Sequence, residues 1–226
     1  MTQLLAATKT DAEIQQDVLR EMKWDTRVEE TDVGVEVDHG VVTLTGTVGN
    51  WAQSYAAMEA AHRVRGVLDV ANDVTVKPPG TGAPTDTDVA HAVRNALEWD
   101  VFVPDTRIRS TVSNGVVSLE GDVDTWTQRE DAEAVVRNLA GVRGVIDVIG
   151  VKVSPVEPAT VRKAIEGALE RQAEREARRV SFEIEDGNVK VYGNVRSWAE
   201  REAVIGAAKG TPGVRTVEDR LRIEPF

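Results

Sequence analysis

Hydrophobic and polar positions follow two periods along this chain, and the two periods occur in the same order three times. Apolar residues first recur every three or four positions, as at Ile14, Val18 and Met22, which predicts an amphipathic helix. Apolar and polar residues then alternate over 33–37 and again over 42–44, on either side of a glycine turn, which predicts a β-hairpin. The corresponding helix positions later in the chain are Val89, Val93 and Leu97, and then Val161, Ile165 and Leu169.

A second helix is predicted to begin at a tryptophan in each third of the chain. The residue before the tryptophan is a good helix cap, and Gln or Glu follows that cap at the spacing of a capping box. These pairs are Asn50 with Gln53, Thr125 with Gln128, and Ser197 with Glu200. Small apolar residues then form one narrow helix face, and a glycine ends the helix. The segments 66–76, 141–151 and 213–223 supply a third strand.

The three parts of the chain are copies of one unit. Shifting the sequence by 75 residues, and then by a further 72, aligns the copies without a gap inside a unit. Shared markers are Gly46, Gly121 and Gly193, the tryptophans Trp51, Trp126 and Trp198, and Gly66, Gly141 and Gly213. Unit 1 is placed at 11–77, unit 2 at 86–152 and unit 3 at 158–226, with linkers 78–85 and 153–157. The fold class is α+β: each unit is an α-β-β-α-β domain with a three-stranded mixed sheet, two helices and a right-handed parallel crossover.

This arrangement resembles the BON family (bacterial OsmY and nodulation). The resemblance rests on the turn glycine followed by V-x-[LV]-x-G, on the capped second helix, and on the pattern G-V-x-x-V-x-[ND]-x-[VIL]-x-[VI] in each unit. It implies non-enzymatic modules of periplasmic stress proteins, outer-membrane lipoproteins, secretins and mechanosensitive channels, with contact to phospholipid. One cytoplasmic relative binds potassium. The chain lacks the signal peptide of the periplasmic members and the lipid-accepting cysteine of the lipoproteins, so we expect a cytoplasmic, soluble protein that is peripheral at most.

Charge narrows the range of partners. The chain has a formal net charge of −11, which disfavours binding to nucleic acid. The charge is uneven, because unit 1 carries 6 Lys and Arg against 13 Asp and Glu, unit 2 carries 7 against 12, and unit 3 carries 13 against 12. Unit 3 is therefore the expected contact with a phospholipid surface.

Catalytic chemistry is not indicated. His39, His62 and His91 occupy three different positions of the repeat, without the paired spacing of a metal site, and the carboxylates are scattered. We therefore predict no enzyme, no metal and no cofactor. The repeated tryptophan is interpreted as a residue that seals the core of its own unit, with an interfacial lipid anchor as the alternative. Trp24 and Trp99 are likewise expected at the edge of the core.

Two segments break the repeat and are the candidate contact sites. Val101, Phe102, Val103 and Pro104 form an apolar loop in unit 2, expected to dock between units or to contact a membrane or partner. Unit 3 has the segment 171–179, which contains Arg171, Arg175, Arg178 and Arg179. These arginines fit either a phosphate or anionic-lipid patch or a solvated helix with ion pairs to interleaved glutamates.

The leading hypothesis is a stress-related bacterial binding module that contacts phospholipid surfaces or an envelope protein. One alternative is a cytoplasmic potassium-responsive protein, suggested by the acidic units 1 and 2. Another is a chaperone-like or scaffold protein that binds clients through Phe102.

Overall fold

The computed structural model describes residues 9–78, 83–152, 158–171 and 180–224, and these form three α-β-β-α-β units. Unit 1 contains α1 (Asp11–Trp24), β1 (Val33–Asp38), β2 (Val41–Val48), α2 (Trp51–Arg63) and β3 (Asp69–Val76). Unit 2 contains α3 (Asp86–Trp99), β4 (Ile108–Ser113), β5 (Val116–Val123), α4 (Trp126–Arg137), β6 (Gly144–Asp147) and β7 (Gly150–Val151). Unit 3 contains α5 (Pro158–Arg171), β8 (Val180–Glu185), β9 (Asn188–Val195), α6 (Trp198–Lys209) and β10 (Thr216–Ile223). The predicted fold class is confirmed.

Each sheet is mixed and has the second strand in its centre. In unit 1, β2 pairs antiparallel with β1 and parallel with β3, and β9 pairs in the same way with β8 and β10. In unit 2 the third strand is interrupted, so that β6 and β7 each pair with part of β5. The repeat therefore preserves topology even where one strand is broken.

The predicted apolar positions build a separate core in each unit. Ile14, Val18 and Met22 on α1 are buried against valines of β1 and β2 and against the alanines of α2. Val89, Val93 and Leu97 have the same role in unit 2. In unit 3, Val161 and Ile165 are buried with Phe182 and the valines of β9. Because alanines carry no side chain beyond Cβ, the second helix lies close to its sheet.

The glycine near the end of the second strand is required by a close approach. Gly46 has φ 126°, and a Cβ atom placed there would lie 2.1 Å from the carbonyl oxygen of Asp32. Gly121 has φ 136° and the same clash with the carbonyl oxygen of Arg107, while Gly193 has φ 134°. A side chain at these positions would be both strained and in collision with backbone.

The predicted second-helix caps are present with one difference. Asn50, Thr125 and Ser197 each accept a hydrogen bond from the backbone N–H three residues later. The return bond reaches the cap's own N–H only in unit 2, from Thr125 to Gln128. Gln53 and Glu200 accept instead from the N–H of the residue before the cap. The complete capping box that was predicted three times therefore forms once.

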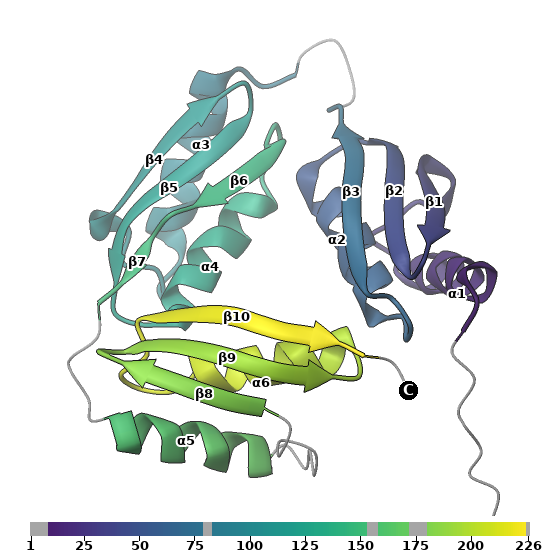
Figure 1. The fold of residues 1–226 in the computed structure, drawn as a ribbon. Coiled ribbons are helices and arrows are strands. Elements are labelled where there is room, and N and C mark those ends of the chain that lie inside the picture. Colours follow the sequence, from purple (N-terminus) through teal and green to yellow (C-terminus); the bar gives the residue numbers. More distant parts are fainter. Residues whose placement is uncertain (1–8, 79–82, 153–157, 172–179, 225–226) are drawn as a thin grey trace, which may run out of the picture.

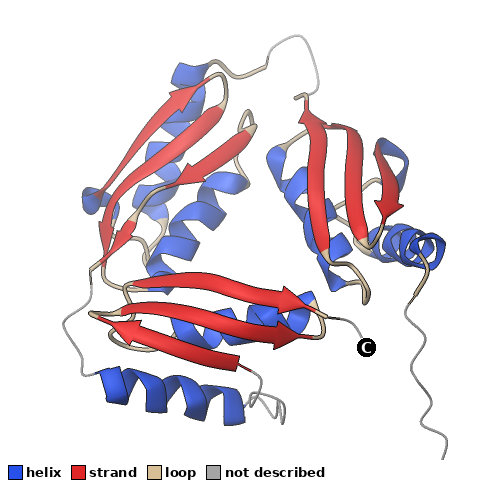
Figure 2. Cartoon of the chain, in the orientation of Figure 1, coloured by secondary structure: helices blue, strands red, loops and turns tan. Residues whose placement is uncertain are grey.

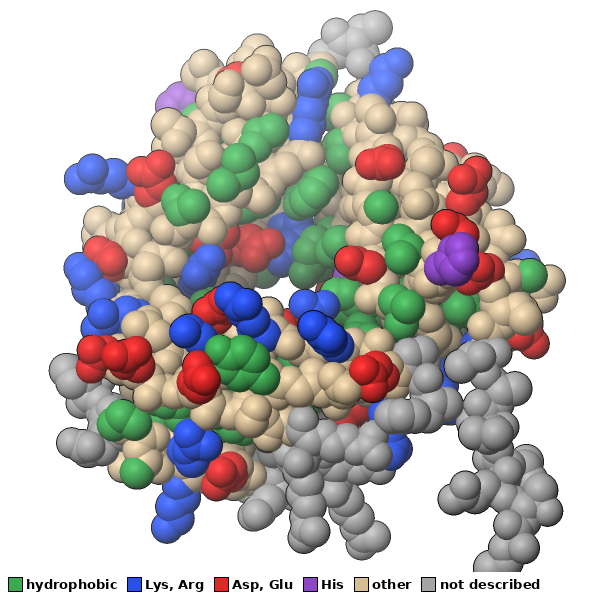
Figure 3. All heavy atoms as spheres, viewed as in Figure 1, with side chains coloured by type: hydrophobic (Ala, Val, Ile, Leu, Met, Phe, Trp, Pro, Cys, Tyr) green, Lys and Arg blue, Asp and Glu red, His purple; other side chains and the backbone are tan. Residues whose placement is uncertain are grey.

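The three units are arranged around a common centre. The third strands β3, β6 and β10 lie at the inner edges of their sheets and run in the same sense around that centre (Figure 1). The first helices α1, α3 and α5 lie on the outside, and the sheets face the same side (Figures 1 and 2). A space-filling view shows a hollow where the units meet (Figure 3). The arrangement resembles a three-fold ring built from one chain.

Candidate functional site

The repeated tryptophans lie at the contacts between units. Trp198 of unit 3 packs against the hydrophobic core of unit 1, and Trp51 of unit 1 packs against the core of unit 2. Trp126 packs against its own core and is also covered by Lys209 of unit 3, whose Nζ lies 5.2 Å from the ring centroid. The interpretation that each tryptophan seals its own core is therefore wrong for Trp51 and Trp198. A bulky side chain in the first helical turn stands at the edge of its unit, where the next unit reaches it.

One repeat position supplies the opposite side of every contact. This position is in the last turn of the second helix and holds His62, Arg137 and Lys209. The imidazole of His62 stacks on the indole of Trp198, with ring centroids 3.9 Å apart and planes inclined by 23°. The guanidinium carbon of Arg137 lies 3.6 Å from the ring centroid of Tyr55, and Lys209 donates to the Glu130 carboxylate at 3.0 Å. The first half of each second helix thus meets the last turn of another one. That of α2 meets the end of α4, that of α4 meets the end of α6, and that of α6 meets the end of α2.

An arginine of the same unit also lies over the ring of two of the tryptophans. The Arg201 guanidinium carbon lies 4.2 Å from the ring centroid of Trp198, and that of Arg129 lies 5.1 Å from Trp126. Both arginines are held by a carboxylate of the third strand, with Arg201 Nε 2.6 Å from Asp219. Trp198 consequently contacts both Arg201 of its own unit and His62 of unit 1. Contacts of this kind with the indole face are attractive for a cation.

The same pattern is altered in unit 1. Ser54 stands where units 2 and 3 have arginine, and it is completely buried and bonded to Asn72. Arg129 bonds Asp147 at the equivalent place in unit 2, at 2.7 Å. The serine and asparagine keep the helix-to-strand bond but supply no charge to Trp51.

Polar atoms are poorly satisfied at these contacts. The indole nitrogens of Trp51, Trp126 and Trp198 are shielded from solvent and bond to no partner among the described residues. Nε2 of His62 and Nε of Arg137 are in the same condition. An unbonded polar group in a buried place destabilises the contact that buries it. The contacts between units are therefore weaker than their apolar packing alone would make them.

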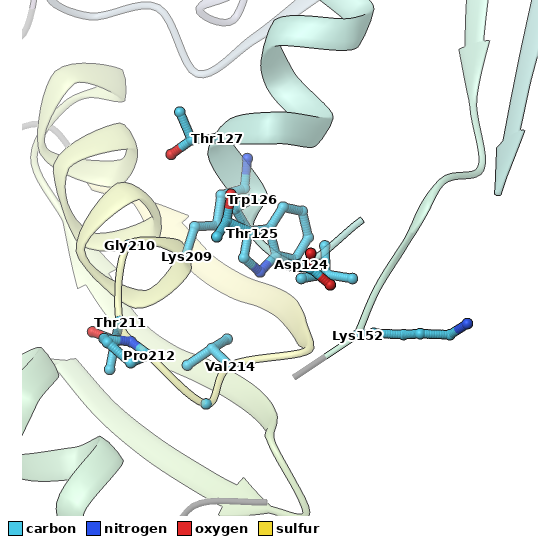
Figure 4. Close-up of a pocket in the computed structure, with 12 residues that line it drawn as sticks. Asp124, Thr125, Trp126, Thr127, Lys152, Lys209, Gly210, Thr211, Pro212 and Val214 are labelled. Atoms are coloured by element: carbon cyan, nitrogen blue, oxygen red, sulfur yellow. The ribbon is translucent and has the colours of Figure 1, made fainter. Parts of the chain in front are cut away.

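Hollows lie at the contacts between the described parts of the units. One of about 560 Å³ lies between units 2 and 3 and is lined by Trp126, Lys152, Lys209 and the turn 210–214 (Figure 4). Lys152 points away from the Trp126 and Lys209 pair in that view, and it is bonded to Asp122 at 2.8 Å. Another, of about 390 Å³, lies between units 1 and 3 and is lined by Tyr55, Met58, His62, Trp198 and their neighbours. Carboxylates pair with both lysines, so the larger hollow does not offer free positive charge.

A different set of apolar residues is exposed to solvent. Trp24 is 79% exposed and Trp99 is 85% exposed, so the expectation that they lie at the core edge is wrong. Each is two residues beyond a buried residue of its helix, Met22 or Leu97, and two residues turn a helix by about 200°. That rotation directs the indole away from the sheet.

The apolar loop of unit 2 adds to this set. Val101 is 88% exposed and Phe102 is 70% exposed, while Val103 is buried in the unit's own core. The expectation that this loop docks between units is therefore wrong. Asp100 accepts the N–H of Phe102 at 2.9 Å, which fixes a turn with the phenyl ring outside. We call Trp24, Trp99, Val101 and Phe102 the aromatic surface.

The predicted basic segment is described only at its first residue. Arg171 ends α5 and occupies the repeat position of Trp24 and Trp99. Arg175, Arg178 and Arg179 lie outside the described residues. The prediction that these arginines contact lipid stays a prediction.

Within residues 9–78, 83–152, 158–171 and 180–224, no group of three or more His, Cys, Asp and Glu side chains converges as a metal would require. None of the helices in the same ranges has the length and hydrophobicity needed to cross a bilayer.

Comparison with a protein-family model decides the family. The model for the BON domain matches three times, at residues 10–78, 85–153 and 159–225. The chain belongs to the BON family. Its three BON domains are units 1, 2 and 3, called domains 1, 2 and 3 below.

Two relatives share part of the sequence. Osmotically-inducible protein Y of Escherichia coli (strain K12) is 32% identical over 122 residues, which cover 52% of this chain and 61% of the relative. The aligned region is thus less than two thirds of that relative's length. A 21 kDa hemolysin of Actinobacillus pleuropneumoniae is 29% identical over 148 residues, which cover 64% of this chain and 76% of that protein.

Among solved structures, CdsD, a structural protein of the type III secretion system of Chlamydia trachomatis, is aligned over 95% of this chain and 93% of that chain. The sequence identity is 15% and the TM-score is 0.28. A superposition at that score supports no argument about the arrangement or the function of the BON domains.

Proposed function

We propose that this protein is a non-enzymatic, stress-related binding module that contacts phospholipid surfaces through the aromatic surface of domains 1 and 2. The observation that carries the proposal is the exposure of Trp24, Trp99, Val101 and Phe102, which are 70% to 88% exposed and exceed the other large apolar side chains of the described residues in this respect. Exposed apolar side chains of this size mark interaction sites. Tryptophan in particular is favoured where water meets lipid, because its ring is apolar and its N–H is polar.

The ring arrangement supports a common binding side. Closed head-to-tail contacts between equal repeat positions relate the domains by rotation about one axis. Equivalent residues then lie at the same height along that axis. Trp24 and Trp99 are such residues, and Arg171 is their counterpart in domain 3. We therefore propose that Trp24, Trp99 and Arg171, the first residue of the segment 171–179, lie on the same side of the ring.

The distribution of charge assigns different roles in lipid binding to domain 3 and to the aromatic surface. The net charge of −11 repels anionic lipid, and domain 3 is the part of the chain without a net negative charge. In the proposal, the arginines of 171–179 bind lipid phosphates, and the aromatic side chains insert beside the headgroups. The stress-related part rests on the relationship to the osmotically inducible relative.

Flotation with liposomes tests the proposal. Wild-type protein is expected to float with vesicles that contain anionic phospholipid at low salt, and the double variant Trp99→Ala/Phe102→Asp is expected to float much less. Arg178→Glu/Arg179→Glu should reduce flotation on anionic vesicles more than on neutral ones. Ile146→Asp is a matched control, because Ile146 is an exposed apolar residue on β6 outside the aromatic surface.

Wild-type protein that stays unbound, or a Trp99→Ala/Phe102→Asp variant that floats as well as Ile146→Asp, would show that the aromatic surface does not bind phospholipid. Loss of flotation in Ile146→Asp to the same extent would assign the effect to altered folding.

A further inference from the structure

The contact between domains 1 and 3 closes the ring, and it differs from the other two contacts in how it is tethered. Domains 1 and 2 are joined by a short linker at 78–85, and domains 2 and 3 by one at 153–157. Domains 1 and 3 are not consecutive in the chain, so the contact of His62 with Trp198 has no linker of its own. This contact is free to open while both linkers stay as they are.

The closing contact also differs in its chemistry. The equivalent residues at the other contacts are an arginine and a lysine, Arg137 and Lys209, whereas this contact has a histidine, the side-chain type used for pH switching. Lys209 has the Glu130 carboxylate at 3.0 Å. His62 has only aromatic stacking on this side, and its Nε2 is buried without a hydrogen-bond partner among the described residues.

The charged groups around His62 come from three elements. Glu59 and Arg63 are on α2, and Arg63 is already paired with Glu21 and Asp25. Asp69 begins β3. On α6, Arg201 lies over the ring of Trp198, and Glu202 lines the same hollow without bonding Nε2. A proton on His62 would put a positive charge close to Arg201 and bury an N–H donor that has no acceptor among the described residues.

The burial of His62 and the charges around it determine how its pKa, and therefore the stability of the closed ring, depends on pH. Burial lowers the pKa of His62, and Arg201 lowers it further, against the opposing influence of Asp69 and Glu59. Once domain 3 moves away, the imidazole returns toward the ordinary histidine pKa of about 6.5. The open ring therefore binds the proton more tightly than the closed ring. Closure has its full strength above about pH 6.5 and loses it as the pH falls through the lower pKa of the closed form.

We propose that the contact of His62 with Trp198 is a pH-sensitive closure, and that a proton on His62 opens the ring between domains 1 and 3. The three domains are expected to stay folded in the open form, because the buried residues of each core all come from one domain. Opening removes the fixed geometry that holds domain 1 beside domain 3, and it exposes the ring of Trp198. A mild acidification would then change the shape of the protein without unfolding it.

Small-angle X-ray scattering at pH 7.5 and pH 5.5 tests the proposal, with far-ultraviolet circular dichroism to show that the domains remain folded. Wild-type protein is expected to be compact at the higher pH and to have a radius of gyration larger by several ångströms at the lower pH. His62→Gln, which cannot take a proton, should stay compact at both. His39→Gln is the matched control, because His39 is fully exposed in a hairpin turn and should leave the wild-type expansion unchanged.

Trp198→Ala supplies the open reference. It removes the stacking partner and is expected to be expanded at both values of pH with unchanged secondary structure. The proposal is overturned if wild-type protein keeps one radius of gyration across this range, or if His62→Gln expands as wild type does. If His62→Gln expands at pH 5.5, the expansion would have to come from protonation of carboxylates elsewhere in this acidic chain. A histidine titration by nuclear magnetic resonance should also give His62 a pKa below the ordinary histidine value of about 6.5, and a value at or above it would contradict the closure.

Discussion

The indole of Trp198 stacks on the imidazole of His62 at 3.9 Å between ring centroids, although these residues belong to the third and the first BON domains. The same positions of the repeat meet at the contact of domains 2 and 3, where Lys209 lies over Trp126. The repeated tryptophan therefore joins domains to one another. The tryptophan that all three copies share thus lies at contacts between domains, whereas Val101 and Phe102, which break the repeat, are exposed to solvent.

The contact of domains 2 and 3 predicts a specific cross-link. Lys209 Nζ lies 3.0 Å from Glu130 Oε1, so a zero-length carbodiimide reagent should join these two side chains. Peptide mass spectrometry of the treated protein should find this pair. Lys209→Arg keeps the charge but removes the amine, and it should lose the product. If the pair is absent from the wild-type digest while nearby lysines react, domains 2 and 3 do not meet as described.

The second-helix cap of domain 3 makes a measurable contribution to stability. Ser197 accepts the N–H of Glu200, which would otherwise lack a helical partner. Ser197→Ala should lower the free energy of unfolding of domain 3 by about 1 kcal/mol. Denaturant titration of the wild type and the variant measures the difference. Ser181→Ala, at an exposed position of β8, should change stability by less than about 0.5 kcal/mol, and a similar loss in both variants would rule out the cap as its cause.

Two glycines of the chain should respond to alanine in opposite directions. Gly46→Ala places a Cβ 2.1 Å from the Asp32 carbonyl oxygen at φ 126°, and it should destabilise domain 1 by about 2 kcal/mol or more. Gly206 lies in α6 and a Cβ there meets nothing within 4 Å, so Gly206→Ala should stabilise domain 3 by about 0.5 to 1 kcal/mol. Thermal melts of both variants measure the changes. Equal responses would contradict the backbone strain assigned to Gly46.

The sequence predicted the fold well because each domain repeats the local signals. The spacing of Ile14, Val18 and Met22 fits one helix face, and all three are buried. The glycine turns and caps mark where elements change. Three copies at constant spacing then exclude an accidental match to any one pattern.

The contacts between domains could not be predicted from the patterns within each domain. A pattern within one unit describes the faces that the unit buries in itself, and Trp198 is buried by another unit. One available signal was the shared position of His62, Arg137 and Lys209, where each copy has a basic side chain or imidazole near the helix end. The exposure of Trp24 could have been predicted, since it lies about 200° around the helix from Met22.

The stacked pair of domains 1 and 3 gives the most direct test of the ring. At pH 7.5, a nuclear Overhauser effect should connect the imidazole protons of His62 with the indole protons of Trp198, because the two rings are in contact. The signal should vanish in Trp198→Ala, with the other tryptophan resonances retained. Observation of the effect in the wild type would place the two domains together as the ring requires, and its absence at that pH would contradict the closed arrangement of the three domains.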